Sequence, residues 1–318
     1  MRIAGIAPAP LLVLLFGLLL TLLAGCDQVK DPEDLFPDSP LELTDGYCVV
    51  AGDRVVLNHH DIDYYDYGTH LIYLKEHRLL SEILEQAEGV LTVYAGGEEI
   101  YPLGIHPGFS SYAPAGPFIW TDPTFYADHM IAISQLYTYD VFMGNLDDPR
   151  DDPRIVEALK KYDQYREGLH CEIKAIWFSS PDHLALTLSL SNRDAEDYYY
   201  LDPEKMGMGL FHYFTNGLTI TNLETEQTYS NNVLHVEPEP WDGFNMEWMT
   251  LLEGNSSVNI TLRYNNFQQA PEGNYLARFM FPGLQYQVER DELVQSQGRI
   301  WLGQLQLYRE VVISHDLF

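Results

Sequence analysis

Alternation of apolar and polar residues in the C-terminal half constrains the fold of this chain more than any other feature. Residues 183–192 and 257–264 place an apolar side chain at nearly every second position, and residues 275–281 continue the same period. Successive side chains of a strand point to opposite faces, so a period of two indicates strands with one buried face. Turn clusters separate these segments. We therefore predict a mainly β protein with two packed antiparallel sheets over residues 171–311.

One turn in this region has a family counterpart. The segment Pro271-Glu272-Gly273-Asn274-Tyr275 resembles the turn and corner tyrosine that precede a late strand in immunoglobulin-like sandwiches. Antibody domains carry a cysteine two residues after the tyrosine, where this chain has Ala277. The resemblance implies an immunoglobulin-like domain outside the antibody type and implies no catalytic residues. We expect its last strand over residues 300–308, with Gly303 as a bulge.

The N-terminal half predicts a smaller α+β region over residues 46–145. Its pattern indicates strands, one short helix over Glu76–Glu88, a hairpin around Gly96-Gly97 and a long loop up to Pro117. A connector helix follows within residues 146–170. Asp152 and Pro153 match an N-cap and first helical position, and Gly168 suits the C-terminus.

The first 26 residues have the layout of an export signal. Arg2 precedes an apolar run, and small residues lead to Cys26. Leu23-Ala24-Gly25-Cys26 resembles the lipobox of bacterial lipoproteins, which implies a signal peptide over 1–25 and a lipid-bearing Cys26. The alternative is an uncleaved membrane-spanning anchor, because the uncharged run from Ile3 to Cys26 is nominally long enough to cross a bilayer. Asp27 resembles the retention signal of the inner membrane, so we favour the periplasmic face of that membrane over the outer membrane.

Charge excludes one class of partner. The chain has 18 Lys+Arg and 47 Asp+Glu, a net charge of -29. Such a field opposes binding to nucleic acid and to anionic lipid surfaces. Residues 26–45 are rich in acids and prolines and predict a solvated tether, and residues 312–318 a tail.

Cys48 and Cys171 are the other two cysteines. An oxidising compartment permits a disulfide between them, and two free buried thiols are the alternative.

Two groups of residues are candidate metal sites. His59, His60, Asp61 and Asp63 combine ligands that suit Zn²⁺, although adjacent histidines on a strand point to opposite faces. A polar turn is the alternative. The acids of 147–152 and 192–197 offer oxygen ligands for Ca²⁺, with solvated loops as the alternative. We predict no cofactor from any established motif.

Aromatic residues suggest a binding surface. Tyr198, Tyr199 and Tyr200 lie beside predicted loops and offer stacking faces and hydroxyls, while packing of alternate members on a sheet is the alternative. No motif pairs a catalytic nucleophile with a base. Ser110-Ser111 lack the Gly-x-Ser-x-Gly sequence of a nucleophile elbow. His170 and Cys171 are neighbours on a predicted strand and should point to opposite faces. His212 falls in a segment, 211–217, that predicts a strand and an Asn-Gly turn.

These observations favour a lipid-anchored, non-enzymatic module that binds a protein, peptide or glycan at the cell envelope. A secreted metal-dependent hydrolase built on His59–Asp63 and a Ca²⁺-stabilised structural envelope protein are the alternative hypotheses.

Overall fold

A computed structural model describes residues 43–87, 90–112, 114–121, 124–136, 147–241, 243–284 and 288–314. The predicted signal peptide, Cys26 and most of the tether lie outside these residues. Residues from Leu43 onward form one compact unit. In the described ranges, no helix has both the length and the apolar character needed to cross a membrane. The structure is 44% strand and 13% helix, so the prediction of a mainly β fold is confirmed.

The first part of the chain builds a nine-stranded sheet with the order β2-β1-β5-β6-β7-β8-β4-β3-β9. Most neighbours are antiparallel, but β6 and β7 run parallel, as do β3 and β9. The predicted hairpin is formed by β5 and β6, which turn at Gly96-Gly97. The expected long loop is shorter than predicted because β6 extends to Pro107. The strands are β1 (Tyr47–Ala51), β2 (Arg54–Asn58), β3 (Ile62–Asp66), β4 (Leu71–Leu74), β5 (Leu91–Ala95), β6 (Glu98–Pro107), β7 (Phe118–Thr121), β8 (Met130–Ser134) and β9 (Tyr165–Arg166).

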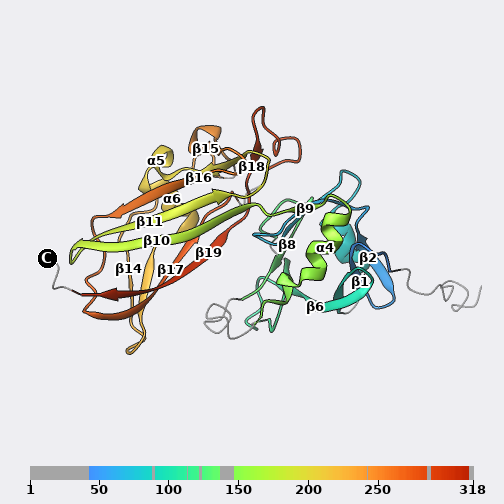
Figure 1. The fold of residues 1–318 in the computed structure, drawn as a ribbon, viewed down its shortest axis with the longest axis horizontal. Helices are drawn as coiled ribbons and strands as arrows, with labels where there is room; N and C mark the ends of the chain where they lie inside the picture. Colours follow the sequence, from blue (N-terminus) through green and yellow to red (C-terminus); the bar gives the residue numbers. More distant parts are fainter. Residues whose placement is uncertain are drawn as a thin grey trace, which may run out of the picture. The chain divides into compact units, whose positions relative to one another are not determined.

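Two helices accompany this sheet, α2 (Leu80–Gln86) and α4 (Pro153–Lys161), of which Figure 1 labels α4. The Asp152 side chain accepts from the Arg154 backbone N–H and Pro153 is the first helical residue, which confirms the predicted start of α4. The predicted end is wrong: α4 stops at Lys161, and Gly168 instead makes the turn between β9 and β10 (Leu169–Ser180). The α4 face that carries Ile155, Ala158 and Leu159 is buried, as its spacing predicted.

The second part of the chain contains three smaller sheets (Figure 1). Their orders are β10-β11-β16, β14-β13-β17-β19 and β15-β12-β18. The strands after β10 are β11 (His183–Asn192), β12 (Tyr198–Leu201), β13 (Thr219–Asn222), β14 (Thr228–Ser230), β15 (Met249–Leu252), β16 (Ser257–Tyr264), β17 (Gly273–Phe281), β18 (Arg299–Ile300) and β19 (Leu305–Ile313).

The first two of these sheets share one buried core, as the alternating pattern predicted. Leu186, Leu188 and Leu190 of β11 belong to the same apolar cluster as Phe279 and Phe281 of β17. The corner tyrosine is also confirmed, because the Tyr275 hydroxyl donates to the Pro271 carbonyl at 2.7 Å. A hydrogen bond of this kind contributes about 1 kcal/mol and fixes the turn into β17.

Two segments differ from the sequence-based predictions. Residues 211–215 form part of a helix, α6 (Met208–Thr215), which follows the short helix α5 (Pro203–Met206). Asn216 ends α6 in a left-handed conformation rather than turning a hairpin. Residues 300–308 are not one strand: β18 ends at Ile300, and the chain enters the other sheet as β19 at Leu305.

The break between β18 and β19 brings residues 301–303 against the N-terminal sheet. Trp301 is buried and its Nε1 donates to Oδ2 of Asp66, the last residue of β3, at 3.2 Å. Gly303 lies so close to Thr69 that an added Cβ would meet the threonine Cγ2 at 2.2 Å. Gly168 has a φ of +73°, and its Cβ would lie 2.4 Å from Asp66 Oδ1, so only glycine fits beside this carboxyl group.

Candidate functional site: a cavity lined by aromatic and amide side chains

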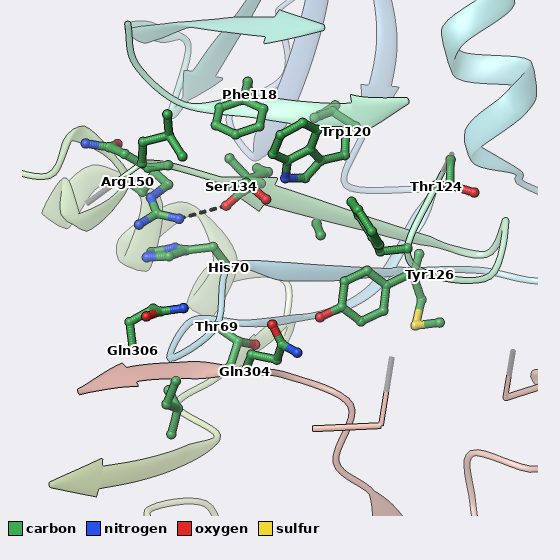
Figure 2. Close-up of a pocket in the computed structure, with 18 of the residues that line it drawn as sticks. Thr69, His70, Phe118, Trp120, Thr124, Tyr126, Ser134, Arg150, Gln304 and Gln306 are labelled. Carbon is green, nitrogen blue, oxygen red and sulfur yellow. Dashed lines mark hydrogen bonds between the residues drawn. The ribbon is translucent and has the colours of Figure 1, made fainter. Parts of the chain in front are cut away.

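A cavity of about 450 Å³ is the strongest candidate site in the part of the chain that the structure describes. Five separate segments line it: residues 68–70, Leu80 of α2, residues 118–136 with gaps, Arg150, and residues 304–306. Figure 2 shows Phe118 and Trp120 on one side of the cavity, with Thr69, Gln304 and Gln306 on the opposite side. The volume falls within the range of roughly 300–1,000 Å³ found for small-molecule sites.

The aromatic side is built around Trp120, on β7. Its ring makes perpendicular contacts with Phe118 at 4.8 Å and with His106 at 5.0 Å between ring centroids. Phe125 also meets the indole edge-to-face, at 5.9 Å, and remains 47% exposed. Trp120 is half-buried, so packed neighbours fix its orientation while part of the ring remains accessible.

His70 forms one end of the cavity from an unusual backbone position. Its φ of +53° lies in the left-handed region, which non-glycine residues rarely adopt. The ring is almost fully buried and Nδ1 shares a 3.0 Å hydrogen bond with the Tyr65 hydroxyl. Burial, and secondarily the charge of Arg150, hold the pKa of His70 well below its usual value of 6.5. The imidazole is therefore neutral at pH 7.

Arg150 lies beside His70 in Figure 2 and carries the one Lys or Arg charge among the described residues that line the cavity. Its side chain is 4% exposed and pairs with Asp148, which is 6% exposed, at 2.6 Å. Nη1 also donates to the Ile133 carbonyl at 2.7 Å. Burial opposes ionisation of Asp148, but hydrogen bonds and charge from Arg150 lower the pKa of that carboxyl group. The pair is thus ionised and adds no net charge to the site.

The neutral polar lining includes three glutamine amides, of Gln135, Gln304 and Gln306. Gln306 Oε1 accepts from Arg278 Nη2 at 3.5 Å. The Gln304 amide has no hydrogen-bond partner among the described residues, and neither does Gln135 Oε1, which is buried. Each amide presents both a donor and an acceptor. Unpartnered amides at a cavity wall are suited to hydrogen-bond a polar ligand.

The predicted metal residues do not form a site. His59 stacks on Tyr162 with ring centroids 3.9 Å apart, and Asp61 lies 3.6 Å from the Arg78 Nε. Asp63 and His60 are exposed. Within the described ranges, no three His, Cys, Asp or Glu side chains are placed to hold a metal ion. The interpretation as a polar turn before β3 fits this geometry better.

In the acidic segments 147–152 and 192–197, several carboxylates pair with arginines or accept hydrogen bonds from other protein groups. Asp148 and Asp152 pair with Arg150 and Arg154. Asp194 accepts from the Gly168 backbone N–H at 2.8 Å and from the Tyr198 hydroxyl at 2.9 Å. These contacts give the three carboxylates partners within the protein.

The tyrosine cluster is not an exposed surface. Tyr198, Tyr199 and Tyr200 form β12, and Tyr198 and Tyr200 are 2% and 4% exposed. Only Tyr199 is half-buried. The alternative, that alternate members pack inward, is what the structure shows.

The remaining candidates also lie away from the cavity. Cys48 on β1 and Cys171 on β10 are both free and buried, so the disulfide left open by the sequence is not formed. His170 and Cys171 face opposite ways, as expected. His212 is fully buried on α6, where Nδ1 hydrogen-bonds the Met208 carbonyl at 2.7 Å.

Sequence reasoning missed the residues that do converge, His70, Trp120, Arg150 and Gln304. They come from four segments whose proximity depends on the sheet order. One signal was available: residues 100–121 contain no Asp, Glu, Lys or Arg, which is unusual in so acidic a chain.

Comparisons with known proteins add little. No protein-family model matches the chain, and no curated protein matches it. Among solved structures, the β-glucosidase from Kluyveromyces marxianus in complex with glucose aligns with 45% of this chain and 14% of that chain, at 11% identity and a TM-score of 0.19. This chain therefore spans only a small part of the enzyme's length, and the alignment is too weak to indicate a shared fold.

Proposed function

We propose that this protein is a lipid-anchored, non-enzymatic binding module of the bacterial cell envelope, and that the cavity at Trp120 and Gln304 is its ligand site. The observation that carries the proposal is the cavity itself, which combines an aromatic wall with unpartnered amides. Among the described lining residues, His70 is neutral and shares a hydrogen bond with Tyr65, and Arg150 is paired with Asp148, so neither presents a free cation to a ligand. These features suit reversible recognition of a protein, peptide or glycan segment.

The proposed anchor is lipid on Cys26. One acyl chain gives only marginal membrane attachment, whereas several chains on one residue give stable attachment. We expect labelled fatty acid to be incorporated into the wild-type chain and into Cys48→Ser, and both proteins to sediment with membranes. Cys26→Ser should lose the label and leave the membrane fraction. Equal labelling of Cys26→Ser and the wild type would exclude this mode of attachment.

The binding site is tested by filling the cavity. Ser134 lies on β8 at the cavity wall, so Ser134→Phe should abolish binding, while Ser257→Phe on the exposed face of β16 should not. Glycan and peptide fragments from digested envelopes are mixed with full-length protein in detergent, and saturation-transfer NMR detects bound fragments. We expect at least one fragment class to bind wild type and Ser257→Phe and to be recovered chemically unchanged.

Two results would contradict this proposal. Binding that persists in a folded Ser134→Phe protein would place the site elsewhere. Conversion of a bound fragment, seen as a new mass that depends on the cavity, would identify an enzyme.

A further inference from the structure

From the chemistry of the cavity lining we infer that the ligand is a neutral saccharide, bound with a ring face against Trp120 and its hydroxyls against the glutamine amides. This inference rests on the proposed function and names the ligand class of the same site.

The charge of the lining is the first argument. Of the chain's 318 residues, 47 are acidic, so a lining of this size would by chance include about three acids. The described residues that line the cavity include none. Arg150 is neutralised by Asp148 at 2.6 Å, and the low pKa of His70 keeps the imidazole uncharged. An ionic ligand would find no counter-charge here and would lose its hydration.

The placement of polar and apolar groups is the second argument. A pyranose ring has faces covered by C–H bonds and a rim of hydroxyl groups. The cavity offers the matching surfaces on opposite sides, with Phe118 and Trp120 facing the side that carries Thr69, Gln304 and Gln306 (Figure 2). Each hydroxyl both donates and accepts, and so does each amide. The pairing therefore needs no charged residue.

The segment that supplies the aromatic wall continues toward solvent. The Gly108 N–H donates to the Thr121 carbonyl at 2.7 Å, which places the loop after β6 beside the end of β7. This loop carries Phe109 and Tyr112, which are 80% and 71% exposed. Phe109 and Tyr112 thus lie on the loop that precedes β7 and Phe125 on the loop that follows it, so exposed aromatic side chains occur on both sides of this cavity-lining strand in the sequence. A ligand of more than one sugar unit would use these side chains.

The test measures binding by titration calorimetry with full-length protein in a detergent whose head group contains no sugar. The probes are maltose, cellobiose and chitobiose, with digalacturonate as the acidic counterpart and a blocked neutral tripeptide, acetyl-Gly-Phe-Gly-amide, as the non-sugar control. We expect at least one neutral disaccharide to bind at least about tenfold more tightly than digalacturonate and the tripeptide.

Matched variants connect this binding to the cavity. Trp120→Ala and Gln304→Leu should each weaken the disaccharide by about tenfold or more. Trp177→Ala, which removes a 45% exposed tryptophan on β10, should leave affinity unchanged. Thermal unfolding of each variant verifies that it is folded.

The outcomes separate the two proposals. If the tripeptide binds and Trp120→Ala abolishes that binding, the saccharide inference fails while the cavity remains a binding site. If none of the three disaccharides binds at about 10 mM, or if Trp120→Ala and Gln304→Leu bind as tightly as wild type, the inference is overturned.

Discussion

Asp66→Asn should make the protein more stable than wild type at pH 8 by up to about 4 kcal/mol, and should make little difference near pH 4. Asp66 is 2% exposed, and burial raises its pKa from 3.8 to about 7. Each unit of difference between folded and unfolded pKa corresponds to about 1.4 kcal/mol. Asn has the shape of the protonated acid and retains an oxygen that can accept from Trp301.

The sign follows from the raised pKa. The folded state binds the proton more tightly than the unfolded chain, so the stability gained from protonation is fully present below about pH 4. It is lost as pH rises through about 7. Burial outweighs the hydrogen bonds from Thr69 and Trp301 that lower the pKa of Asp66, Asp194 adds like charge, and the neighbouring Tyr64 and Tyr198 are neutral phenols with raised pKa values.

Urea unfolding of wild type, Asp66→Asn and Asp63→Asn between pH 4 and pH 8 measures this effect. Asp63 is exposed on the same strand, so its variant should follow the wild-type curve. A stability difference between Asp66→Asn and wild type that is constant over this pH range would show that Asp66 titrates normally.

Arg150→Met is expected to destabilise the protein by about 3–5 kcal/mol, because it leaves the Asp148 carboxylate buried without its cation. The chain contains its own control. Asp148-Pro149-Arg150 and Asp152-Pro153-Arg154 have the same sequence pattern, and in both the aspartate accepts from the arginine backbone N–H. The first pair is 6% and 4% exposed, whereas Asp152 and Arg154 are 21% and 42% exposed.

Arg154→Met should therefore cost no more than about 1 kcal/mol. The double variant Asp148→Leu/Arg150→Met should recover most of the stability lost by Arg150→Met, since replacing a buried ion pair with apolar residues is often neutral. Chemical denaturation of the four proteins at pH 7 measures these differences. Equal losses in Arg150→Met and Arg154→Met would mean that burial of the first pair has no energetic consequence.

Local patterns predicted those parts of the fold in which neighbouring residues decide the structure. Alternation in β11 and β16, the Asp152 cap and the Tyr275 corner each depend on a few consecutive residues. Residues 211–214 show the limit of such reasoning. A short run of aromatic residues suits a buried helix as well as a strand, and tertiary packing selected the helix α6.

Local sequence patterns could not predict the cavity. His70, Trp120, Arg150 and Gln304 have no common spacing, and they converge only because β7, β8 and β4 are neighbours and β18 and β19 belong to different sheets. The clusters of neighbouring residues in the sequence, at His59-His60 and at Tyr198–Tyr200, did not form the predicted sites. His59 and His60 lie in the turn between β2 and β3 with ring centroids 4.0 Å apart, but His59 is stacked on Tyr162 and no third ligand joins them among the described residues. On β12, adjacent side chains point to opposite faces, so Tyr198 and Tyr200 turn inward and Tyr199 does not join them.

The hydrogen bond from Trp301 to Asp66 also affects the order in which parts of the fold can form. It joins residues 235 positions apart, and a second link, from Arg290 to the Leu74 carbonyl, spans 216. In a growing chain, the surroundings of the buried Asp66 and one wall of the cavity therefore stay incomplete until residues 301–306 have emerged. Contacts of such long sequence separation form slowly, so completion of the cavity is a late step of folding.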